Sequence, residues 1–167
     1  MYKRQASVGM HDIAKAAGCS RATLYRYFEN REALHTAYVH REAYALHHRL
    51  VERIAGISDS RERLVAGFLT SLDLVRQSPA LQSWFAASDA PIGAEMAEQS
   101  DVIKAMGAAF VASLEPHGDL AAVDRKARWL VRVLTSLLIF PGRDAEDERA
   151  MVEEFLAPMV ESTSRRR

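Results

Sequence analysis

The sequence of 167 residues has a single cysteine and no long apolar run. One thiol cannot form an internal disulfide, and we interpret Cys19 as a buried side chain without a redox role. No apolar stretch approaches the roughly 18 residues of a membrane span. We therefore expect a soluble, cytoplasmic protein of one or two small domains that does not enter a membrane.

An excess of charge of one sign is also missing, because 22 Lys and Arg residues balance 22 Asp and Glu residues. The balance is uneven along the chain: residues 1–55 carry nine basic against five acidic side chains, and residues 56–167 carry thirteen against seventeen. A basic N-terminal part supports nucleic-acid binding. Lys3 and Arg4 lie in a segment that we interpret below as non-native, so charge alone does not decide the function.

Catalytic and metal-binding patterns are absent from the sequence. No nucleophile and base are spaced as a catalytic pair, and no glycine-rich loop could cradle a phosphate. Most histidines lie near the N-terminus, but no two of them form an i, i+4 pair with a carboxylate partner, as a metal site on a helix would require. These histidines are His11, His35, His40, His47 and His48. We expect no enzyme activity, no metal and no cofactor.

Residues 12–28, DIAKAAGCSRATLYRYF, are what the sequence does have: two short helices joined by a tight turn. Gly18 suits the left-handed C-cap of the first helix, and Ser20 can cap the second. Cys19 and Leu24 are spaced as a hydrophobic staple. The apolar positions that would face inward are Ile13, Ala14, Ala17, Leu24 and Phe28. This pattern predicts a helix-turn-helix.

The second helix carries the polar side chains that a DNA groove requires. In a helix-turn-helix its N-terminal end enters the major groove, which brings Arg21, Ala22, Thr23 and Arg26 nearest the base edges. Tyr25 and Tyr27 can donate hydrogen bonds from their hydroxyl groups to phosphates. The full set of candidate DNA contacts is His11, Arg21, Ala22, Thr23, Tyr25, Arg26, Tyr27 and Arg31. The alternative is a surface helix with incidental arginines.

Residues 9–34, GMHDIAKAAGCSRATLYRYFENREAL, resemble the DNA-binding signature of TetR-type transcriptional regulators, through DIA, AG and TLYxxF. The resemblance implies DNA contacts at Ala22, Thr23, Tyr25, Tyr27 and Arg31. It covers about 26 residues. One departure is Gly9, which stands where the family often has a Thr or Ser cap and offers backbone amides but no hydroxyl to a phosphate.

A second departure concerns the start of the chain. The family places a full helix before the motif, and only eight residues precede Gly9. The first five residues, MYKRQ, can be read from the end of a transposase sequencing adaptor. We therefore interpret residues 1–5 as non-native and expect the gene to continue upstream.

The rest of the sequence predicts an all-α chain. We expect helices over residues 31–54, 59–76, 79–87, 92–114, 120–140 and 145–160, from caps such as Asn30 and Asp59 and breaks at Pro-Gly pairs. The domains expected are a partial helix-turn-helix domain at 6–48, with its motif at 9–28, and a helical ligand-binding and dimerisation domain at 49–161. A disordered tail follows at 162–167.

The penultimate helix is apolar around most of its circumference between residues 127 and 140, which indicates burial on two sides. One side can pack within the chain and the other against a second copy, together with the last helix. The resemblance also implies a homodimer. We expect the dimer interface at Trp129, Leu130, Val133, Leu134, Leu137, Met151, Phe155 and Met159. A central core helix of a monomer is the alternative.

Apolar residues between residues 68 and 110 could line a ligand cavity, or could be ordinary core. We expect the cavity at Phe68, Leu72, Trp84, Phe85, Met96, Ile103, Met106 and Phe110. Few charges interrupt these faces, so the ligand would be an apolar small-molecule effector.

Together these patterns predict an all-α, TetR-type regulator that binds a palindromic double-stranded DNA operator as a dimer, as a repressor, and responds to a ligand. The alternative is a small-molecule-binding dimerisation module that does not read DNA in this form.

Overall fold

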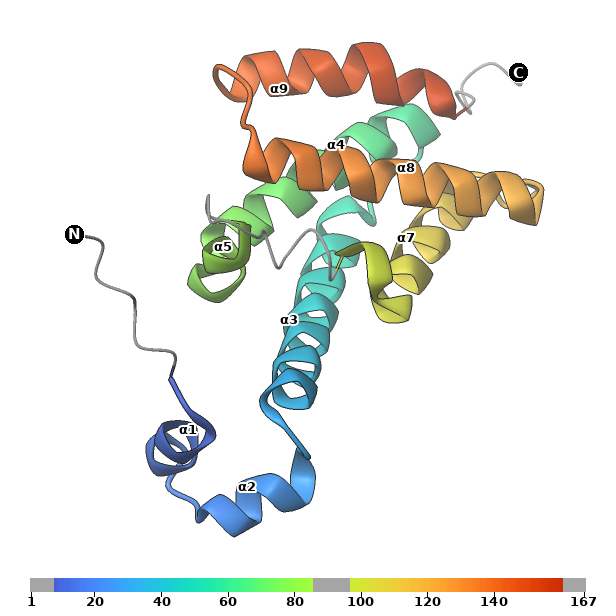
Figure 1. The fold of residues 1–167 in the computed structure, drawn as a ribbon. Coiled ribbons are helices and arrows are strands. Elements are labelled where there is room, and N and C mark those ends of the chain that lie inside the picture. The colour runs from blue at the N-terminus through green and yellow to red at the C-terminus, as the bar shows by residue number, and fades with distance from the viewer. Residues whose placement is uncertain (1–7, 86–96, 161–167) are drawn as a thin grey trace. The chain divides into compact units, whose positions relative to one another are not determined.

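The computed structural model describes residues 8–85 and 97–160, without the side chains of residues 80, 83 and 84. Every regular element in these ranges is a helix, which confirms the all-α prediction (Figure 1). The chain divides into two compact units between Arg41 and Glu42. This division lies within one continuous helix, a few residues before the predicted domain boundary.

The first unit contains helices α1 (Met10–Ala16) and α2 (Arg21–Tyr27) and the beginning of α3 (Arg31–Ile54). Gly18 has a φ of 66°, the left-handed conformation that glycine adopts at least cost. Ser20 accepts a hydrogen bond from the Thr23 amide at 3.0 Å, so it caps α2 as expected. Asn30 does the same for α3 through the Ala33 amide at 2.8 Å.

A small core joins the two motif helices. Met10, Ala14 and Leu24 are buried. Ile13, Cys19, Phe28 and Leu34 pack against them and are partly buried. Ala17 was expected on this face, but it is exposed, because α1 ends at Ala16 and Ala17 already belongs to the turn. Met10 contributes the extra buried side chain instead.

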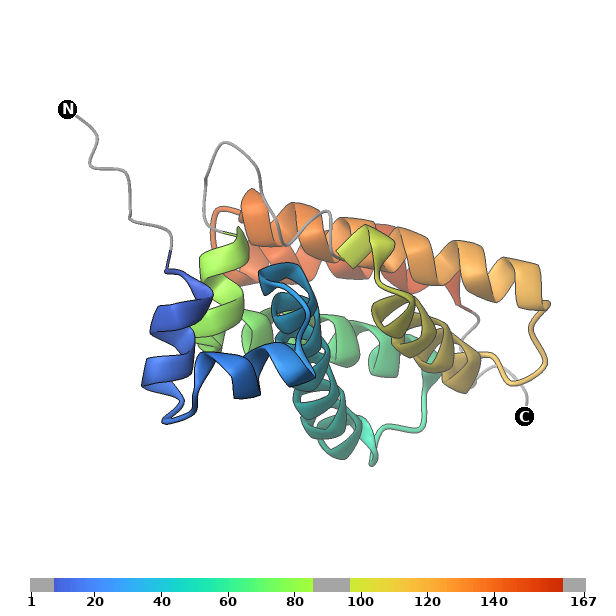
Figure 2. The same cartoon turned by 60° about the horizontal axis from the view of Figure 1, so that its bottom comes forward.

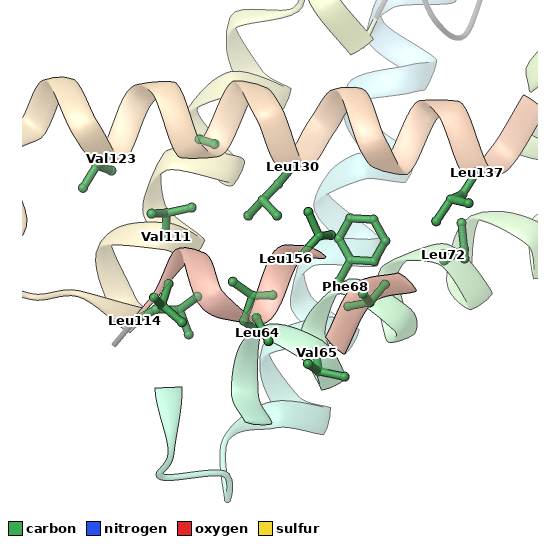
Figure 3. Close-up of a cluster of buried hydrophobic side chains, with 14 residues drawn as sticks. Leu64, Val65, Phe68, Leu72, Val111, Leu114, Val123, Leu130, Leu137 and Leu156 are labelled. Carbon is green, nitrogen blue, oxygen red and sulfur yellow. The ribbon is translucent and has the colours of Figure 1, made fainter. Parts of the chain in front are cut away.

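The second unit contains most of α3, with α4 (Ser60–Gln77), α5 (Pro79–Phe85), α7 (Asp101–Leu114), α8 (Leu120–Ile139) and α9 (Ala145–Met151). Figure 2 shows α7 packed along α8, the most extensive helix pair of the unit. Its core is formed by Leu64, Phe68 and Leu72 of α4, Val111 of α7, and Leu130 and Leu156 (Figure 3).

Side-chain caps set the helix starts. Asp59 accepts from the amides of Arg61 and Glu62 and caps α4. Ser100 accepts from the Ile103 amide at 3.3 Å, so α7 begins at Asp101 and the single helix predicted over 92–114 is wrong for its described part. Residues 97–99 are helical but precede this cap. Residues 92–96 lie outside the described ranges.

The last predicted helix, over 145–160, changes its winding after α9. Residues Val152–Leu156 form a π-helical turn, in which the Ala157 amide donates to the Val152 carbonyl, and Ala157–Met159 form a 3-10 turn. Pro158 lies in this last turn and has no amide hydrogen to continue an α-helix. Val152, Leu156 and Val160 are buried along this segment.

One buried ion pair fixes the turn between α8 and α9. Arg76 of α4 donates to both carboxylate oxygens of Glu148, each at 2.7 Å, and to the Leu137 carbonyl at 3.0 Å. Glu148 is only 4% exposed and also accepts from the Gly142 amide at 2.9 Å. The pair thus links α4 to the end of α8 and the start of α9, which lie at least 61 residues further along the chain.

Candidate nucleic-acid interface

Helix α2 has one buried and one exposed face. Leu24 is 6% exposed and Phe28 is half-buried on the inner side. The exposed residues of the helix are Arg21, Ala22, Tyr25, Arg26 and Tyr27. Every one of them is a predicted DNA contact, so the structure presents these side chains together on a single short helix.

Both arginines of α2 lie over tyrosine rings. The Arg21 guanidinium carbon is 5.3 Å from the centre of the Tyr25 ring, one turn further along. The Arg26 guanidinium carbon is 5.2 Å from the Tyr27 ring centre. Such cation–π contacts leave the N–H donors of the guanidinium available to another partner. The sequence interpretation missed these pairs, although the i, i+4 spacing of Arg21 and Tyr25 is a visible signal.

The remaining predicted DNA contacts differ in how accessible they are. His11 on α1 and Arg31 at the start of α3 are exposed. Thr23 is half-buried, and its hydroxyl lies 2.9 Å from the hydroxyl of Ser20. Thr23 therefore supports the cap of α2 besides any contact with DNA.

The start of α1 is closed by a side chain that the sequence interpretation did not consider. The Gly9 amide donates to the Asp12 carboxylate at 3.1 Å. The Gly9 amide, which was expected to be open to a phosphate, is therefore already hydrogen-bonded to Asp12. The Asp12 carboxylate also places a negative charge at the same end of the helix.

The predicted ligand-binding residues are not gathered around one described cavity. Phe68 and Leu72 are buried in the main core, 4% and 1% exposed. Phe110 packs against that core and against a second cluster around Leu50. Phe85, Ile103 and Met106 are half-buried. The Trp84 side chain and Met96 lie outside the described residues.

Clefts with charged linings are present in the described part of the second unit. A cleft of about 660 Å³ lies between α4 and the α8–α9 turn and includes Leu72, Asp73, Arg76 and Glu146. A smaller one of about 150 Å³ lies along α8 and includes Lys104, Asp124 and Arg132. Only Leu72 among the predicted ligand residues lines either of them.

The predicted dimer-interface residues separate into three groups. Leu130 and Leu137 are 7% and 8% exposed and point into the core of their own protomer, toward Leu156 and Leu72 (Figure 3). The structure therefore assigns these two to the core and not to an interface. Half-buried residues that pack against that core are Val133, Leu134, Met151 and Met159.

Three large aromatic side chains of the last helices remain exposed. Trp129 is 52% exposed and Phe155 is 66% exposed, and both were predicted interface residues. Phe140, which was not predicted, is 74% exposed. Trp129 lies in the middle of α8, and Phe140 is the C-cap residue of the same helix.

The described part of the chain contains no cluster of three or more His, Cys, Asp or Glu side chains that could hold a metal ion. None of its helices combines the length and the apolar character that a membrane crossing requires.

Known proteins resemble this chain in sequence and in fold. The family model for bacterial regulatory proteins of the tetR family matches residues 6–38. Two relatives from Mycobacterium tuberculosis, the uncharacterized HTH-type transcriptional regulators MT1294 (strain CDC 1551 / Oshkosh) and Rv1255c (strain ATCC 25618 / H37Rv), are each 57% identical over 159 residues. Each match covers 95% of this chain and 78% of the relative.

A solved structure has the same fold. The crystal structure of the TetR family repressor AlkX from Dietzia sp. strain DQ12-45-1b matches with a TM-score of 0.66 and 21% sequence identity. The match covers 93% of this chain and 86% of AlkX.

Proposed function

Because this chain belongs to the TetR family of bacterial transcriptional regulators, which bind DNA and are not enzymes, we propose that it is a ligand-responsive repressor that binds a palindromic operator as a homodimer. The observation that carries the proposal is the outer face of α2. It presents Arg21, Tyr25, Arg26 and Tyr27 beside the small side chain of Ala22.

This face has the chemistry of a groove-binding helix. Arginines supply donors to base edges and phosphates, and tyrosine hydroxyls supply donors to phosphates. Ala22 would let the helix backbone approach the floor of the groove. The opposite face is held by the buried Leu24, which fixes the helix on its support.

The exposed aromatic residues of the last helices support a homodimer. Trp129, Phe140 and Phe155 present large apolar surfaces to solvent in the isolated protomer. A second copy related by two-fold symmetry would cover the same residues on both chains and would place two α2 helices on two half-sites of a palindrome.

The dimer is tested by sedimentation of the unmodified chain and of single variants. Covering one large aromatic side chain contributes about 1.5–3 kcal/mol, counted twice in a symmetric dimer, so Trp129→Glu should raise the dissociation constant by at least about 100-fold. Leu120→Glu is the matched control, because Leu120 is 84% exposed and nine residues away, on the opposite face of α8. A monomeric unmodified chain, or equal effects of the two variants, would contradict the interface.

DNA binding is tested by selecting operator sequences with the purified protein from random duplexes. We expect the selected sites to be palindromic, with half-sites about one helical turn apart or a multiple of it. Specific binding should exceed non-specific binding by at least about 10³-fold at physiological salt. Dimers without any sequence preference would favour the alternative, a small-molecule-binding dimerisation module.

The effector would be an apolar small molecule that binds one state of the dimer more tightly than the other and thereby lowers operator affinity. The half-buried apolar side chains Ile103 and Met106 of α7 support this class of ligand. The test is release of the selected operator by hydrocarbons and fatty alcohols of graded length, with the matching charged amines and carboxylates as controls. Equal release by charged and apolar compounds would reject an apolar effector.

A further inference from the structure

We propose that Arg21, held against the ring of Tyr25, reads a guanine in each operator half-site. The inference rests on the proposed DNA-binding function and adds to it the base that is recognised and the residue that recognises it. It is carried by the position of Arg21 on α2, by its contact with Tyr25 and by the chemistry of the guanidinium group.

The position of Arg21 places it at the entry of α2 into the groove. It is the first residue of the helix, directly after the Ser20 cap, and it is exposed. The N-terminal residues of a recognition helix are those that contact base edges. Arg26 was expected near the base edges, but it lies near the end of this seven-residue helix, so we assign it here to the phosphate backbone.

The contact with Tyr25 restricts the Arg21 side chain before DNA arrives. An arginine has many rotamers in solution, and ordering a long side chain on binding costs free energy. The Tyr25 ring, 5.3 Å from the guanidinium carbon, favours rotamers in which the side chain lies along the exposed edge of α2. Because the attraction acts through the π face, the N–H donors are not consumed.

No described carboxylate competes for these donors. Within the described residues, the Arg21 guanidinium makes its cation–π contact with the ring of Tyr25. Acidic side chains near it in sequence, Asp12 and Glu29, are engaged with the Gly9 amide and the Asn30 side chain. The fork of parallel N–H groups is therefore free for a ligand with two acceptors side by side.

Guanine presents that pair of acceptors in the major groove. Its O6 and N7 accept two hydrogen bonds from one guanidinium, whereas adenine offers N7 beside an amino donor that repels it. Cytosine presents an amino donor and thymine a single carbonyl and a methyl group. Arg21 consequently distinguishes guanine from the other three bases.

The experiment uses the full chain and the operator that it selects from random duplexes. In one half-site at a time, the invariant guanine is replaced by 7-deazaguanine, which keeps base pairing but lacks the N7 acceptor. Fluorescence anisotropy then gives the affinity ratio of the two duplexes. The unmodified protein should lose affinity, but by less than the roughly 5- to 150-fold that a whole bidentate contact provides, because the O6 acceptor remains.

Variants of Arg21 and Tyr25 distinguish recognition of the guanine by Arg21 from positioning of Arg21 by Tyr25. Arg21→Ala should bind both duplexes equally. Tyr25→Phe keeps the ring, so it should keep the ratio while weakening both duplexes through the lost hydroxyl. Tyr25→Leu should reduce the ratio by about 2- to 5-fold, the value of an exposed cation–π contact. Arg26→Ala is the matched control and should weaken both duplexes without changing the ratio.

The outcomes distinguish this inference from the proposed function. The inference is overturned if the selected operator has no invariant guanine, or if Arg21→Ala keeps the full preference for guanine over 7-deazaguanine. Either result is still compatible with the proposed DNA-binding regulator. Failure of the unmodified protein to select any sequence overturns both. If Tyr25→Leu and Tyr25→Phe show the same affinity ratio between the guanine and 7-deazaguanine duplexes, the Tyr25 ring does not position Arg21.

Discussion

Replacing Arg76 by methionine should destabilise the second unit more than most surface changes, because it leaves the Glu148 carboxylate buried without its cation. Glu148 is 4% exposed, and both of its oxygens accept from Arg76 at 2.7 Å. After the substitution, the Gly142 amide at 2.9 Å is the remaining donor among the recorded partners.

The magnitude follows from the burial of the two partners. Removing one member of a buried ion pair typically costs 3–5 kcal/mol. The Arg76 side chain is 32% exposed, so water partly screens the pair, and we expect about 3 kcal/mol. Replacing both partners, as in Arg76→Met with Glu148→Leu, removes the unpaired charge and should restore stability to within about 1 kcal/mol.

The effect should depend on pH in a defined direction. The hydrogen bonds from Arg76 lower the pKa of Glu148 below its ordinary value of 4.5. The pair therefore stabilises the unmodified protein above this value, and its contribution is lost as the pH falls through the lower native pKa. In Arg76→Met, burial instead raises the pKa of Glu148, so the difference between the two proteins should shrink toward acidic pH.

Urea unfolding followed by circular dichroism, at one protein concentration, measures the effect. Arg149→Ala is the control, because the Arg149–Glu153 pair is 3.5 Å long with side chains 57% and 55% exposed. An exposed i, i+4 pair contributes only about 0.3–0.5 kcal/mol. Equal midpoint shifts for Arg76→Met and Arg149→Ala, or a double variant no more stable than the single one, would refute the reasoning.

Two glycine substitutions test the packing and the backbone. Gly67→Ala should destabilise the second unit by about 1–3 kcal/mol in urea unfolding, because a Cβ there would lie 2.6 Å from the Phe110 ring. In Gly107→Ala the nearest atom is 3.5 Å away, so a loss as large as that of Gly67→Ala would contradict the packing argument. Gly18→Ala should weaken the helix-turn-helix by about 1–2 kcal/mol, measured by hydrogen exchange of α2, because its φ is 66°. Gly56→Ala, which has open space and no positive φ, should leave stability unchanged or raised, and a matching loss there would reject the strain at Gly18.

Local signals in the sequence were enough to predict the helix-turn-helix and the positions of most helices. The turn depends on Gly18 and Ser20, which act through their own backbone conformation and through hydrogen bonds three residues away. The start of α3 depends on Asn30 in the same way. Such interactions are local, so the residue types and their spacing are enough to predict them.

Local signals were not enough to predict where two of the helices begin or end. Ser100 interrupts a segment that reads as one helix, and the π turn after Met151 accommodates Pro158 while its buried residues stay in the core. Ser and Pro occur both inside helices and at their ends. Whether a helix ends or changes its winding at such a residue depends on which conformation packs the flanking residues better against the rest of the protein.

Which apolar residues are core and which are surface depends on how the helices pack, and the sequence did not reveal this. Between residues 127 and 140 most positions are apolar, and the sequence could not separate Leu130 and Leu137, which are buried in their own protomer, from Trp129 and Phe140, which are exposed. The Arg76–Glu148 pair joins residues 72 positions apart and left no local pattern. Burial and ion pairing depend on which helices meet in space, and that is set by the sum of many contacts between segments distant in the chain.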